Sequence, residues 1–66
     1  MMLEQFIGEE VRVTRRGVGG RDIYGVLQKS NGMYLLVAYK RVLTFADSAI
    51  KRWWWDRVSG LVHIQF

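Results

Sequence analysis

The sequence predicts a mainly β domain in which a short N-terminal helix precedes a five-stranded, strongly bent antiparallel sheet. Short runs of alternating apolar and polar residues indicate strands with one buried face. The pair Asn31-Gly32 between two such runs is typical of a hairpin, because a type I′ turn needs positive φ at both positions. Gly25, in the middle of a predicted strand, indicates the bend or bulge that a small barrel requires.

The N-terminal segment is expected to form the short helix. Leu3, Phe6 and Ile7 have the spacing of one helical face, and Gly8 stands where a helix C-cap would lie. A helix this short is unstable alone, so we expect it to dock on the sheet.

Four further segments have the pattern of strands. They cover residues 9–16, 21–30, 33–43 and 61–66. The third segment is apolar on both faces, and strands of that kind are usually buried on both. In so small a protein, we expect the second face of this strand to meet another chain.

The segment 44–57 is ambiguous between a helix and a strand, loop, strand arrangement. Thr44 and Asp47 resemble a capping box, which favours a helix. The run Trp53-Trp54-Trp55 favours a strand instead, and we prefer that interpretation. On a strand, Trp53 and Trp55 share one face, which we expect in the core. Trp54 then lies on the other face, in a subunit interface, a base-stacking platform or ordinary surface.

Length and composition limit the possible classes of protein. The 66 residues form one domain at most, assigned here as residues 1–66, with a net charge of +4 and no cysteine. Disulfides and thiolate metal sites are therefore excluded, and one histidine does not make an imidazole site. Half of the residues are apolar, with three Trp, three Tyr and three Phe. So many apolar residues in so short a chain favour a protein that self-associates over a monomer with an unusually aromatic core.

We expect a cytoplasmic protein with no membrane association. No segment is apolar over the roughly 20 residues that a membrane helix needs. The segment 1–7 is too short for a signal peptide and carries Glu4 in place of a basic cluster.

The sequence does not predict an enzyme. Glu9 and Glu10 are adjacent, so on a strand they point to opposite faces and cannot act as a carboxylate pair. His63 is the only candidate base at neutral pH, and its alternation with Val62 and Ile64 places it on an outer or interface face. We therefore expect no catalytic residue, no metal site, no cofactor and no small-molecule substrate.

The order of elements resembles the Sm/LSm family, in which an N-terminal helix precedes the five strands of a bent barrel. The resemblance covers about residues 3–66, and both Sm motifs match loosely. The positions that fit are Gly25 and Leu27 in the first motif and Val58, Gly60, Val62 and Ile64 in the second. The resemblance implies a homo-oligomeric ring of five to eight subunits. The other folds we considered are a monomeric five-stranded barrel of the Src-homology type and a sheet with a packed helix over 45–57.

The base-binding positions of the family are altered in this chain. The matching positions here are Met33 for the stacking residue, Leu35 for the asparagine and Ser59 for the arginine. The first motif departs as well, since Asn31 stands at its aspartate position. Leu35 cannot hydrogen-bond a base edge, and Ser59 cannot stack on one. RNA is therefore expected to bind at another surface.

The basic residues point to a polyanionic partner. A pI near 10 is typical of proteins that bind nucleic acid. Most of the cations are arginines, whose side chains can donate two parallel hydrogen bonds to one phosphate. We expect single-stranded RNA to meet basic loops through its phosphates at Arg15, Arg16, Arg21, Lys51 and Arg52. The residues expected to contact bases are Met33, Tyr34 and Trp54. The alternative is a protein-interaction or structural module with no nucleic-acid role.

Overall fold

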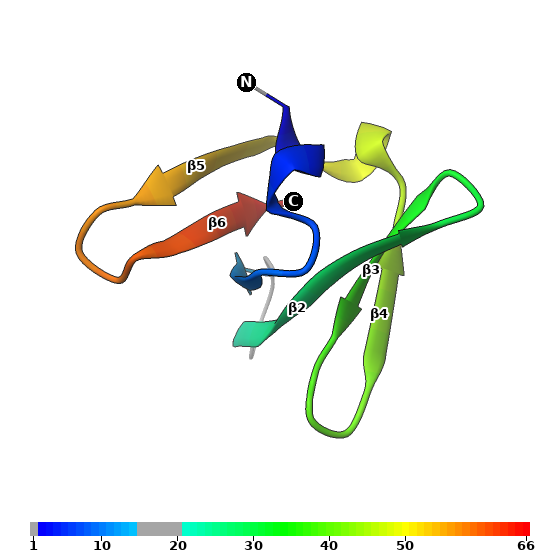
Figure 1. The fold of residues 1–66 in the computed structure, drawn as a ribbon, viewed down its shortest axis with the longest axis horizontal. Coiled ribbons are helices and arrows are strands. Elements are labelled where there is room, and N and C mark those ends of the chain that lie inside the picture. The colour runs from blue at the N-terminus through cyan, green and yellow to red at the C-terminus, as the bar shows by residue number, and fades with distance from the viewer. Residues whose placement is uncertain (1, 15–20) are drawn as a thin grey trace.

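The chain is mainly β, as the sequence predicts (Figure 1). A computed structural model describes residues 2–14 and 21–66. The strands are β1 (Glu10–Thr14), β2 (Asp22–Ser30), β3 (Met33–Val37), β4 (Val42–Phe45), β5 (Arg52–Asp56) and β6 (Leu61–Gln65). Two short 3-10 helices accompany them, η1 (Leu3–Phe6) and η2 (Asp47–Ala49).

The strands form one six-stranded mixed sheet in the order β4-β3-β2-β1-β6-β5. Every neighbouring pair is antiparallel except β1 and β6, which run parallel. The sheet is not closed, so β4 and β5 are its two edges. Figure 1 shows β5 and β6 on one side of the molecule and the β2, β3 and β4 group on the other. The prediction of five antiparallel strands is therefore wrong in strand number and in direction.

The extra strand arises because the segment 33–43 is a hairpin and not one long strand. β3 and β4 are joined by residues 38–41, where the Ala38 N–H donates to the Arg41 carbonyl at 2.9 Å. Val37 and Val42 pair with each other in this hairpin and are 42% and 56% exposed. The second apolar face of the predicted strand is thus partly open to solvent within the chain.

The N-terminal helix is a single 3-10 turn, which docks on the sheet as expected. Leu3 is buried, and Gly8, with φ of 94°, donates its N–H to the Leu27 carbonyl at 2.7 Å. The segment 44–57 has the strand, loop, strand arrangement that we preferred over a helix. In the described part of the chain, no helix has the length and apolar character needed to cross a membrane.

Gly25 lies where β2 changes partners. β2 pairs with β1 up to Val26 and with β3 from Val26 onward. A Cβ at Gly25 would lie 2.7 Å from the Val37 carbonyl oxygen, so the close approach of β3 requires glycine. The Asn31-Gly32 hairpin is confirmed, since the two residues have φ of 52° and 78°.

The core lies on the inner face of the curled sheet, beneath η1. Its side chains are all apolar or aromatic, namely Leu3, Val11, Val13, Leu27, Tyr34, Leu36, Phe45, Val62 and Ile64. Trp53 packs against this core through an edge contact with Phe6, with ring centroids 5.7 Å apart. The opposite, outer face of β2, β1, β6 and β5 is left for polar side chains.

Candidate functional site

A row of four aromatic and cationic side chains crosses the outer face of the sheet. Arg12 on β1 lies opposite Tyr24 on β2 and His63 on β6, and His63 lies opposite Trp54 on β5. The neighbouring positions Val11 and Val13 are buried, so alternation turns Arg12 and its partners outward. We call Tyr24, Arg12, His63 and Trp54 the outer-face row. It spans three strand spacings, or roughly 14 Å.

Arg12 holds the centre of this row between two carboxylates. Its Nη2 donates to Asp56 Oδ2 at 3.3 Å and to His63 Nδ1 at 2.8 Å. Its Nε lies 3.9 Å from Asp22 Oδ2 and makes no hydrogen bond to a described residue. The Asp56 carboxylate also accepts the Val58 N–H, and this bond, with the charge of Arg12, lowers the pKa of Asp56. The positive charge of Arg12 is therefore balanced within the site.

His63 is held in its neutral form by its neighbours. Arg12 can only donate, so Nδ1 of His63 is the acceptor and Nε2 carries the proton. The Nε2–H donates to Thr14 Oγ1, which in turn donates to Asp22 Oδ1 at 2.9 Å. Burial, reinforced by the Arg12 charge, lowers the pKa of His63. This chain of bonds from β6 to β2 fixes the ring against Trp54.

Trp54 contacts both His63 and Arg52. Its ring centroid is 4.2 Å from that of His63, and the Arg52 Cζ lies 4.5 Å from its centroid. The Arg52 Nε donates to Gln65 Oε1 at 2.8 Å. The rest of this exposed guanidinium forms no ion pair with a described residue, so its other N–H groups can donate to a ligand.

Further cations lie beside the outer-face row, where β2 and β5 begin. Thr14 lies opposite Asp22 and Gln65, and Gln65 lies opposite Arg52, so these positions share one level of the sheet. The exposed residues Arg21 and Lys51 directly precede the first residues of β2 and β5, which are Asp22 and Arg52. Neither forms an ion pair with a described residue.

The structure brings together only some of the residues expected to bind RNA. Arg52 and Trp54 lie on β5 and Lys51 directly precedes that strand, while Arg21 directly precedes β2 at the same end of the face. Tyr34, in contrast, is only 2% exposed and stacks on Phe45 in the core, so its ring faces cannot receive a base.

Other predicted positions lie apart from this face or outside the described part. Met33 is half-buried at the start of β3 and does not belong to the outer-face row. Arg15 and Arg16 lie outside the described residues. Trp55 is 53% exposed, so the expectation that it belongs to the core is wrong.

Sequence reasoning missed Arg12, Thr14, Asp22 and Tyr24 as parts of a site. The alternation of β1 and β6 placed Arg12 and His63 on polar faces, which was the available signal. Their contact depends on the parallel pairing of strands that lie at opposite ends of the chain. No local pattern indicates that pairing.

Comparison with known proteins adds no relative: no protein family, no curated protein and no solved structure matches this chain. Within residues 2–14 and 21–66, no group of three or more histidine, aspartate or glutamate side chains is placed to hold a metal ion. The candidate site must therefore be judged on its own geometry, which combines aromatic rings, a stacked guanidinium and unpaired cations on an open sheet face.

Proposed function

We propose that this chain binds single-stranded RNA, without catalysis, across the outer face of β2, β1, β6 and β5. The observation that carries the proposal is the outer-face row, with Arg52 stacked on Trp54 at its β5 end. Open sheet faces with aromatic side chains are a common way to bind unpaired bases.

Bases would stack at the two ends of the row. Tyr24 is 49% exposed on β2, and the Arg52 guanidinium offers a flat surface on top of Trp54. Stacking on an aromatic or guanidinium plane tolerates any base and contributes about 1–3 kcal/mol per base. Between these ends, the bonded pair of Arg12 and His63 forms a rigid floor.

Phosphates would meet the cations at one end of the face. Arg21, Lys51 and Arg52 have no described acidic partner, so each can neutralise a phosphate. Three such contacts predict a slope of about −2 for the logarithm of affinity against the logarithm of salt concentration. Affinity should then fall roughly 20-fold between 50 and 200 mM salt.

The proposal includes self-association into the ring that the Sm/LSm resemblance implies. β4 and β5 are the edge strands, so each has one side without a partner strand in the described chain. β5 of a second copy can therefore pair with the open side of β4 and extend the sheet. Val37 and Val42 expose apolar surface beside that edge. Light scattering at high salt, which strips nucleic acid, should give a mass of five to eight subunits. A monomer would remove the ring from the proposal.

The direct test is fluorescence anisotropy with a labelled single-stranded RNA 12-mer at several salt concentrations. Trp54→Leu should cost about 1–3 kcal/mol of binding, and Arg52→Gln should reduce the salt slope by about 0.7. Lys40→Gln is the matched control, since it removes one charge from the β3–β4 turn, away from the outer face. Circular dichroism checks that each variant is folded.

The outcomes separate the two classes of function. Loss of binding in Trp54→Leu and Arg52→Gln, but not in Lys40→Gln, supports the outer face as the RNA surface. Equal losses in Arg52→Gln and Lys40→Gln would mean that only total charge matters. No binding at 50 mM salt would reject the proposal in favour of a protein-interaction module.

A further inference from the structure

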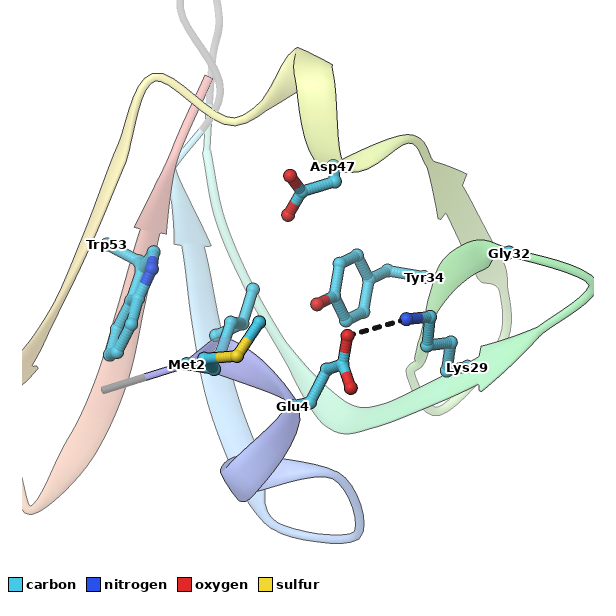
Figure 2. Close-up of a pocket in the computed structure, with 8 residues that line it drawn as sticks. Met2, Glu4, Lys29, Gly32, Tyr34, Asp47 and Trp53 are labelled. Atoms are coloured by element: carbon cyan, nitrogen blue, oxygen red, sulfur yellow. Dashed lines mark hydrogen bonds and ion pairs between the residues drawn. The ribbon is translucent and has the colours of Figure 1, made fainter.

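A second region of the molecule has the opposite charge character. It is a pocket of about 380 Å³ bordered by η1, the β2–β3 hairpin, η2 and β5. Figure 2 shows its walls, to which Met2, Glu4, Lys29, Tyr34, Asp47 and Trp53 contribute. Trp53 points to the inner face of β5, so this pocket and the outer-face row lie on opposite sides of that strand.

The described residues that line this pocket carry more negative than positive charge, in a protein whose net charge is positive. They include the carboxylates of Glu4 and Asp47 and, among the described side chains of the lining, the single cation Lys29. Lys29 Nζ binds Glu4 Oε1 at 2.7 Å. Asp47 makes no side-chain hydrogen bond or ion pair with the described residues, and its carboxylate points into the pocket (Figure 2).

Tyr34 supplies an independent indication of a ligand. Its side chain is almost completely buried, yet its hydroxyl forms no hydrogen bond with a described residue. The hydroxyl is directed into the pocket in Figure 2. Because the Tyr34 ring is buried while its hydroxyl reaches the open space of the pocket, this group marks a position where a polar ligand atom would fit. Burial raises the pKa of Tyr34, so the phenol stays neutral at physiological pH.

Lys29 shows which chemistry this wall accepts. Its ammonium lies beside the Glu4 carboxylate and 5.4 Å from the centroid of the Tyr34 ring. A carboxylate combined with an aromatic ring is a favourable environment for an organic cation. Asp47 and Trp53 add a second carboxylate and a second aromatic ring to the lining of the same pocket.

We propose that the pocket binds an alkylammonium group, between the Asp47 carboxylate, the Tyr34 hydroxyl and the Trp53 ring. Lys29 acts as an internal competitor, because it occupies Glu4 and repels a second cation. The ligand chemistry is that of a lysine side chain on a partner protein or of a free polyamine. The inference does not depend on RNA binding.

Nuclear magnetic resonance of the full chain provides the test, because the indole N–H signals of the three tryptophans can be assigned with single Trp→Phe variants. The probes are a capped Gly-Lys-Gly peptide, the same peptide with its lysine acetylated, and butane-1,4-diamine. The lysine peptide should shift the Trp53 signal saturably, and the neutral acetylated peptide should not. Tighter binding of the diamine than of the peptide would identify a polyamine as the source of the ammonium.

Two matched pairs of variants locate the site. Asp47→Asn should weaken binding of the lysine peptide about fivefold, while Glu9→Gln, which alters another exposed carboxylate, should leave it unchanged. Lys29→Gln should strengthen binding about two- to fivefold, because it frees Glu4 and removes a like charge. Lys40→Gln removes the same charge outside the pocket and should have little effect.

The expected gain of affinity for the lysine peptide in Lys29→Gln is the decisive result, because partial unfolding of the variant cannot produce it. Equal shifts with the acetylated and unmodified peptides would overturn the proposal. So would a loss or no change in Lys29→Gln, or a response of the Trp54 signal alone.

Discussion

The bend of the sheet depends on the absence of a side chain at Gly25, which Gly25→Ala tests. The added Cβ would lie 2.7 Å from the Val37 carbonyl oxygen and 2.9 Å from its carbon, whereas ordinary contact begins at 3.4 Å. β2 or β3 must therefore move apart by about 0.7 Å, and the obstacle is backbone that no rotamer change can relieve.

The magnitude follows from two opposing effects. Overpacking of this kind costs about 1–3 kcal/mol, while replacing glycine by alanine stabilises by about 0.4–1 kcal/mol through the unfolded chain. We expect a net loss of about 1–2 kcal/mol. In a domain of this size, that loss lowers the Tm by roughly 4–16 °C.

Thermal unfolding followed by circular dichroism measures this loss. Gln28→Ala is the control, because it places an alanine at an exposed position of the same strand. Its Tm should remain close to that of the wild type. A Gly25→Ala protein that melts within about 2 °C of the wild type would refute the argument that the close approach of β3 requires glycine.

Three further predictions concern the polar groups of the two surfaces. The pKa of His63 is lower in the folded state, so the unfolded chain binds more protons than the folded chain near pH 6. The contribution of neutral His63 to the free energy of unfolding is therefore complete above pH 6.5 and is lost as the pH falls through the lowered pKa. Melts between pH 5 and 7 should therefore show a steeper loss in the wild type than in His63→Gln, and parallel curves would contradict this. Arg12→Leu should cost about 1–3 kcal/mol in urea unfolding at pH 7, because it leaves His63 Nδ1 without its donor and the Asp56 carboxylate without its cation; an unchanged midpoint would show that Arg12 is dispensable. Tyr34→Phe should change the free energy of unfolding by less than about 0.5 kcal/mol, because the Tyr34 hydroxyl has no described partner, yet it should weaken binding of the lysine peptide. A large loss of stability would indicate that the hydroxyl has a structural role.

Local signals in the sequence predicted the features that depend on neighbouring residues. Asn31-Gly32 specified a hairpin because its backbone conformation is available to few other pairs. Gly25 marked the close contact of two strands, although not which strand would approach it. The turn at 38–41 was missed because Tyr39, Lys40 and Arg41 include none of the usual turn residues.

The candidate sites depend on contacts between distant parts of the chain. Arg12 and His63 are 51 residues apart in the sequence, and they meet only because β1 and β6 pair in parallel. Glu4, Lys29 and Asp47 come from three separate elements that converge at the pocket. Composition and alternation can assign such residues to a face, but the pairing of strands decides which of them become neighbours.

The tryptophan run on β5 links the two surfaces. Alternation along a strand sends Trp53 to the pocket and Trp54 to the outer-face row, so adjacent residues serve opposite faces. β5 is an edge of the open sheet and is covered only partly by η1, which leaves both rings half-buried and accessible. A core strand would need only one of these rings for packing. Trp53 lies beside the carboxylates of the pocket and Trp54 beside the Arg52 guanidinium. This arrangement suits an edge strand that contacts a cationic ligand on one side and an anionic ligand on the other.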